Sequence, residues 1–94
     1  MMDVEGLTAQ IKDALRIRHS ALDDDIRRKI KAAVRDMEMR GVAIPDGEDD
    51  LVATACELYC KGQYDHLGQG ARFMEHYESL RDSMSLNGGY NGKE

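Results

Sequence analysis

The chain has little proline and little that favours strands. It contains no tryptophan, one phenylalanine and one proline, Pro45, and aromatic residues make up only 5% of its 94 residues. The runs of β-branched residues that are typical of strands are absent. The stretches between its turns are instead rich in Ala, Leu, Glu, Lys, Arg and Met, which have the highest helix propensities. We therefore predict an all-α fold.

Cysteine is also scarce, and long apolar runs are missing. Two cysteines, Cys56 and Cys60, are too few for the disulfide framework of a small secreted domain. The longest apolar run is far short of the roughly 20 residues that a membrane-spanning helix needs. The first residues carry Asp3 and Glu5 instead of the basic start and apolar core of a secretory signal. We therefore expect no membrane partner and folding in a reducing cytoplasm.

Positive charge is in deficit, with 13 Lys and Arg against 18 Asp and Glu and a net charge of −5. A general nucleic-acid-binding protein needs basic surface to displace counterions, so this balance argues against that class. The length of the chain predicts a single domain. A domain of this size buries only roughly 60–65% of the surface of its unfolded chain, so its stability margin is thin unless partners add contacts.

What the sequence does contain is four stretches with helical periodicity. Their predicted ranges are residues 7–17, 22–40, 48–64 and 69–85. The second is the clearest, because its apolar residues recur every three or four positions. These apolar residues are Ile26, Ile30, Ala33, Val34 and Met37. Three aspartates occupy its first turn, where the helix dipole favours negative charge, and Ser20 or Asp23 is expected to cap it. Arg40 followed by Gly41 marks its end.

The third predicted helix is apolar around most of its circumference. Such a helix is normally central and packed by several neighbours. Gly62 lies on its apolar side and would let another backbone approach closely. Residues 1–86 are therefore predicted to form a single bundle of about four helices. Residues 87–94 include three glycines and two asparagines, a composition that predicts a flexible tail.

Candidate catalytic or metal-binding groups are few. Cys56 and Cys60 lie four positions apart, with His66 and His76 further along, but this spacing matches no standard zinc site. Both cysteines fall on the apolar side of a helix, where buried free cysteine is common and inert. Acidic clusters at two helix starts are explained by the helix dipole, and no phosphate-binding glycine loop is present. The sequence therefore predicts no enzyme activity, no metal ligands and no cofactor.

Arg27, Lys31 and Arg35 form a basic stripe on the side of the second helix opposite its apolar face. A solvated surface is one interpretation of this stripe. A protein-contact face is another, because Ala32 and Met39 border the same side. Contact with DNA is a third, but a helix-turn-helix reader needs a short polar recognition helix, and the helix that follows here is the most apolar one.

The tail offers a second candidate contact. Asn87, Gly88 and Tyr90 belong to its glycine-rich part. The large amphipathic ring of Tyr90 could become ordered on a partner surface, although the composition is equally consistent with a frayed terminus.

Three blocks of the chain, read together, resemble a known family. They are residues 14–26, ALRIRHSALDDDI; residues 50–64, DLVATACELYCKGQY; and residues 72–86, RFMEHYESLRDSMSL. Their order and spacing, the Gly/Asn/Tyr tail and the chain length are similar to those of the small helical head–tail connector proteins of tailed bacteriophages and prophages. These proteins are also called adaptor or DNA-packaging proteins. The resemblance covers about residues 7–90 and rests on no single sharp motif.

The resemblance implies a structural subunit without catalytic residues. It implies a homo-oligomeric ring of about a dozen copies under the portal protein, which continues the DNA channel to a downstream connector or tail protein. DNA would pass through the ring without sequence-specific recognition, and the protein would reach the head–tail interface of the virion from the host cytoplasm. The partner-contact candidates are then Arg27, Lys31, Arg35, Asn87, Gly88 and Tyr90. The alternative is a small DNA-binding regulator that uses the basic stripe of the second helix.

Overall fold

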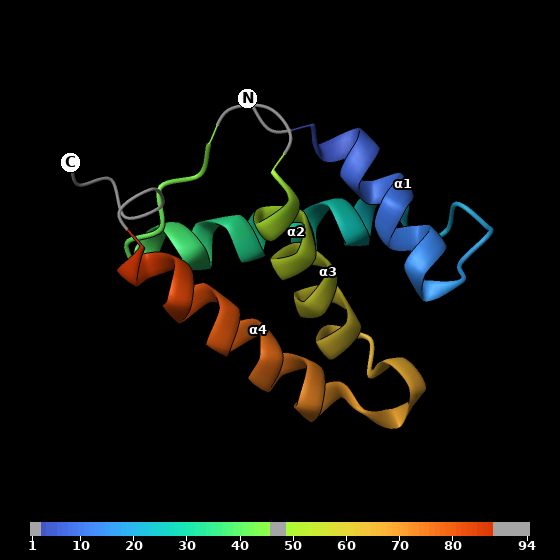
Figure 1. Ribbon diagram of the computed structural model, residues 1–94. Helices are drawn as coiled ribbons and strands as arrows, with labels where there is room; N and C mark the ends of the chain where they lie inside the picture. Colours follow the sequence, from blue (N-terminus) through green and yellow to red (C-terminus); the bar gives the residue numbers. More distant parts are fainter. Residues whose placement is uncertain (1–2, 46–48, 88–94) are drawn as a thin grey trace.

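The computed structural model of the chain describes residues 3–45 and 49–87. Within these ranges it contains four α-helices, one short 3-10 helix and no strand. The elements are α1 (Val4–Leu15), α2 (Asp23–Met39), α3 (Asp50–Gln63), η1 (His66–Gly68) and α4 (Gly70–Leu86). Figure 1 shows the four α-helices packed together in one body, so the predicted all-α bundle is confirmed.

α1 begins and ends earlier than its periodicity predicted. The Asp3 carboxylate accepts a hydrogen bond from the backbone N–H of Gly6 at 2.9 Å and caps the first turn. At the other end, Arg16 adopts a left-handed conformation with φ of 60°, which stops the helix short of the predicted end at Ile17. Both boundaries are therefore set by local hydrogen bonding and backbone conformation at the ends of the helix.

The predicted caps of α2 are wrong. Leu22 occupies the N-cap position and makes no side-chain hydrogen bond there. Ser20 contributes only its backbone carbonyl, which accepts from the N–H of Asp23 at 3.1 Å. The Asp23 carboxylate instead lies 2.7 Å from the Lys12 ammonium of α1. The predicted end of α2 is confirmed, since Gly41 follows it with φ of 90°.

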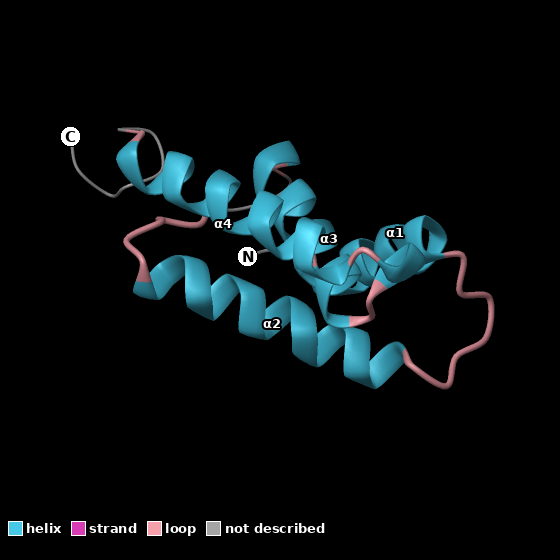
Figure 2. Cartoon of the chain, turned by 90° about the horizontal axis from the view of Figure 1, so that it is seen from below, coloured by secondary structure: helices cyan, strands magenta, loops and turns pink. Residues whose placement is uncertain are grey.

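α3 is the central helix, as predicted. Its N-cap residue, Asp49, accepts hydrogen bonds from the backbone N–H groups of Leu51 and Val52, both at 3.0 Å. α1, α2 and α4 all pack against α3, and Figure 2 shows α2 running along one side of the domain beneath the other three helices. The largest fully buried side chains come from all four helices: Ile11, Ile26, Ile30, Met37, Cys56, Cys60 and Tyr77.

Two glycines allow α3 and α4 to approach closely. A Cβ atom on Gly62 would overlap the side chain of Met74. A Cβ atom on Gly70 would lie 2.8 Å from the carbonyl oxygen of Gly62. The close backbone approach predicted at Gly62 is therefore confirmed, and it occurs where the chain reverses direction between the two helices (Figure 1).

Gly62→Ala is expected to lower the free energy of unfolding by about 1–2 kcal/mol, because Met74 would have to move. In a helix with free space at this position, replacing glycine by alanine would raise the free energy of unfolding by about 1 kcal/mol. Urea denaturation followed by circular dichroism measures the difference. Thr54→Ala, on the exposed side of the same helix, is the control and should cost little. A Gly62→Ala protein more stable than the wild type would contradict the close approach.

Candidate partner-contact surface

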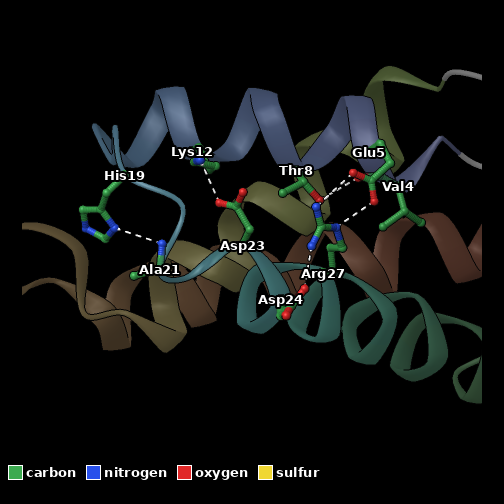
Figure 3. Close-up of polar contacts among 9 residues, drawn as sticks. All are labelled: Val4, Glu5, Thr8, Lys12, His19, Ala21, Asp23, Asp24 and Arg27. Carbon is green, nitrogen blue, oxygen red and sulfur yellow. Dashed lines mark hydrogen bonds and ion pairs between the residues drawn. The ribbon is translucent and has the colours of Figure 1, made fainter.

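The structure divides the predicted basic stripe into two parts. Arg27 lies between α1 and α2, where its guanidinium donates to both carboxylate oxygens of Glu5, at 2.7 and 3.1 Å, and to Asp24 at 2.6 Å (Figure 3). The hydrogen bonds to Glu5 raise the pKa of Arg27 above its ordinary value. Arg27 therefore serves to hold α1 to α2, and most of its donors are already used within the chain.

Further contacts fix the turn that leads into α2. Figure 3 shows the ion pair between Lys12 of α1 and Asp23, the first residue of α2. Between the two helices, the backbone N–H of Ala21 donates to Nδ1 of His19 at 3.3 Å. The orientation of α2 is thus set by contacts of its first turns with α1.

Lys31 and Arg35 follow Arg27 by one and two turns along α2 and are exposed. In the part of the chain that the structure describes, neither forms an ion pair. The Arg28 side chain is 79% exposed and lies 3.9 Å from Asp25. Met39, which is 77% exposed, continues the same side one turn further. We call these four residues, Arg28, Lys31, Arg35 and Met39, the outer face of α2.

The tail candidates fall at the edge of the described residues. Gly88, Tyr90 and the rest of the predicted flexible tail lie outside them. Asn87 follows α4 with an extended backbone, and its N–H donates to the carbonyl oxygen of Met84 at 3.1 Å. Leu86, the last residue of α4, is 83% exposed. The helical body thus presents a large apolar side chain where the tail begins.

The two cysteines are core residues, as the sequence indicated. Cys56 and Cys60 are fully buried in α3 and form no disulfide. Burial raises the pKa of both thiols to about 12, so they remain protonated near neutral pH and are poor nucleophiles and ligands. Among the residues described, no three His, Cys, Asp or Glu side chains are placed to share a metal ion.

Sequence reasoning missed a buried polar cluster between α2 and α4. The Tyr77 hydroxyl donates to Asp36 at 2.8 Å and lies 3.2 Å from the carbonyl oxygen of Ala33. Arg81, only 6% exposed, donates to the same Asp36 oxygen at 2.9 Å and to Asp82 at 3.0 Å. Burial alone would lower the pKa of Arg81, but these hydrogen bonds raise it above its ordinary value. The available signal was the i, i+4 spacing of Tyr77 and Arg81 on the apolar side of α4.

Two hollows in the described surface are small. One, of about 70 Å³, lies between α1 and α3 and is lined partly by Leu7, Ile44 and Val52. The other, of about 120 Å³, lies between the start of α3 and the end of α4, beside Leu51 and Leu80. Pockets for drug-sized ligands are usually about 300–1,000 Å³. Neither hollow has the size of such a pocket, so the outer face of α2 is the strongest candidate surface.

Comparison with protein-family models, with curated proteins and with solved structures finds no match to this chain. No helix in the described ranges is both long and apolar enough to cross a membrane.

Proposed function

We propose that the chain is a non-enzymatic assembly subunit of a tailed-bacteriophage virion. It forms a ring that joins the portal protein to a downstream connector or tail protein and continues the DNA channel. The sequence resemblance supplies this setting. The observation that carries the proposal is the outer face of α2, where three basic side chains and a large apolar one lie together without cover from any described element.

A face of this composition suits contact with another protein. Arg and Met are enriched at interfaces relative to the rest of protein surfaces. The ion pairs of Arg27 and Lys12 already hold α2 against α1, so little backbone freedom remains to be lost on binding. A domain of this size also gains stability from a bound neighbour, because a partner that binds only the folded state shifts the folding equilibrium.

Deletion of the gene from the phage or prophage genome that carries it tests the connector function directly. Electron microscopy of the induced lysate is expected to show heads, filled with DNA or emptied of it, beside separate and finished tails. Supplying the wild-type chain from a plasmid should restore joined virions and serves as the control. Intact and infectious virions after deletion would show that the connector function is wrong.

The same basic side chains make the DNA-binding regulator the second candidate. Phosphates could contact Lys31 and Arg35 of α2. α3, however, is poorly suited to act as a recognition helix, because α1, α2 and α4 all pack against it and Asp49 and Asp50 stand at its start. Titration of the purified chain with duplex DNA separates the two functions. A regulator would bind with an affinity that falls steeply with salt, whereas a connector subunit is expected not to bind alone.

A further inference from the structure

α4 carries an acidic counterpart to the outer face of α2. Glu75, Glu78 and Asp82 are exposed along one side of α4, and Leu86 follows at 83% exposed. Glu75 and Glu78 form no ion pair within the described part of the chain. The Asp82 side chain accepts a hydrogen bond from Arg81 but remains 60% exposed. We call these four residues the outer face of α4.

The two faces have the same spacing. On α2, three basic residues and an apolar one stand at positions 28, 31, 35 and 39; on α4, three acidic residues and an apolar one stand at 75, 78, 82 and 86. Both series are i, i+3, i+7 and i+11, which places each set along one side of its helix. A helix with one series can therefore lie alongside a helix with the other series so that each basic residue faces an acidic one.

Within the described part of one chain, the two faces do not neutralise each other. The inner sides of α2 and α4 are joined, since Tyr77 reaches Ala33 and Arg81 reaches Asp36. The outer faces lie beside these contacts, both are exposed, and no ion pair joins them in the described part of the chain. Their complementary charges are therefore available to another molecule.

We propose that the outer face of α2 in one copy docks on the outer face of α4 in the next copy of the same chain. The two helices lie parallel, with Arg28 opposite Glu75, Lys31 opposite Glu78 and Arg35 opposite Asp82. Each copy then uses one face for one neighbour and the other face for the second neighbour, which is a head-to-tail contact that generates rings when the rotation closes. The inference rests on the proposed function for its setting and assigns the surface by which the ring forms.

The direction of the pairing follows from the apolar ends. Parallel docking brings Met39 against Leu86, which removes two exposed apolar side chains from water. Antiparallel docking would place each of them beside a charged residue.

Charge reversal tests the docking on the full-length chain. Sedimentation velocity at low salt and high protein concentration is expected to show reversible association of the wild type, weakened by added salt because exposed ion pairs are screened. Lys31→Glu/Arg35→Glu and Glu75→Lys/Glu78→Lys should each weaken association at least tenfold. An equimolar mixture of the two variants should restore it, because each reversed face then meets its complement.

The matched control for Lys31→Glu/Arg35→Glu is Arg16→Glu/Arg18→Glu, which lowers the net charge by the same amount at exposed residues outside both faces. It should associate like the wild type. A wild type that stays monomeric under these conditions, or either double variant on its own associating as strongly as the wild type, overturns the docking. The connector function is tested separately, by the particles that the deletion mutant makes. A failure of the docking experiment therefore does not contradict the connector function, and the reverse also holds.

Disulfide trapping tests the register. A chain with Met39→Cys mixed with a chain with Leu86→Cys should form an intermolecular disulfide on mild oxidation. Arg28→Cys mixed with Leu86→Cys, which reports antiparallel docking, should form about tenfold less. Cys56 and Cys60 should not interfere, because both thiols are fully buried. Equal trapping in the two mixtures, or more in the second, overturns the parallel register.

Discussion

Tyr77→Ala is expected to lower the free energy of unfolding by about 3–5 kcal/mol, as large-to-small changes of buried aromatic residues do. Tyr77 is 1% exposed and belongs to the largest fully buried side chains. Its ring meets Tyr59 of α3 edge-on at 5.1 Å between centroids, and the Arg81 guanidinium lies 5.7 Å from its centre. Its loss would therefore leave a cavity where α2, α3 and α4 meet.

Tyr77→Phe separates the ring from the hydroxyl. This variant keeps the packing of the ring but removes the hydrogen bond to Asp36. We expect it to lower the free energy of unfolding by about 1–2 kcal/mol. Urea denaturation monitored by far-UV circular dichroism gives both values. Folded single domains are stable by roughly 5–15 kcal/mol, so the alanine variant should lose a large fraction of its stability. An alanine variant no less stable than the phenylalanine variant would contradict the central place given to this ring.

The helices could be predicted because their periodicity is local. Ile26, Ile30 and Met37 recur at helical spacing, and all three are fully buried in α2. The ends of the helices were harder, because they depend on single conformations such as the left-handed Arg16. Leu22 at the N-cap of α2 follows no sequence preference for that position.

The pairing of Tyr77 and Arg81 with Asp36 could not be predicted, because Asp36 is far from both in the chain. Arg81 is charged and adjoins exposed Asp82, so its sequence context favours the surface. It is buried because Asp36, 45 residues earlier, accepts its hydrogen bond. The basic stripe shows the same limit. Spacing alone groups Arg27 with Lys31 and Arg35, and only the packing of α1 supplies the Glu5 partner that sets Arg27 apart.

The acidic face of α4 was visible in the sequence, but its meaning was not. The spacing of Glu75, Glu78 and Asp82 matches that of Arg28, Lys31 and Arg35. Such runs on a helix are normally solvated surface. The match becomes informative only when the fold shows that both sets point outward, on helices whose inner sides are joined to each other.

Replacing Asp36 by alanine is expected to lower the free energy of unfolding by about 2–3 kcal/mol near neutral pH. Asp36→Ala removes hydrogen bonds from both Tyr77 and Arg81, and bonds that involve charged groups contribute more than neutral ones. The Asp36 side chain is 35% exposed, so solvent weakens the interaction and the expected cost stays below that of a fully buried pair. Arg81 keeps Asp82 as a partner and so remains partly satisfied.

The contribution of Asp36 should depend on pH in a defined direction. Burial alone would raise the pKa of Asp36, but hydrogen bonds from Arg81 and Tyr77 outweigh it and hold the pKa below its ordinary value of 3.8. The folded state therefore binds this proton less readily than the unfolded state does. The stabilisation is fully present above the unfolded pKa and is lost as the pH falls through the folded pKa.

Urea denaturation between about pH 7 and pH 2.5 measures this loss, because the window spans the ordinary carboxyl pKa range. The free energy of unfolding of the wild type should fall towards the acidic end of this range. The difference in free energy of unfolding between the wild type and Asp36→Ala should become smaller there. Asp36→Asn is the control: it keeps an oxygen acceptor but no charge, so its gap to the wild type should also narrow at low pH. A gap that stays constant across the whole range would mean that the ionised carboxylate of Asp36 contributes nothing. In that case the packing of Tyr77 and its hydrogen bond to the Ala33 carbonyl oxygen would remain to join α2 and α4.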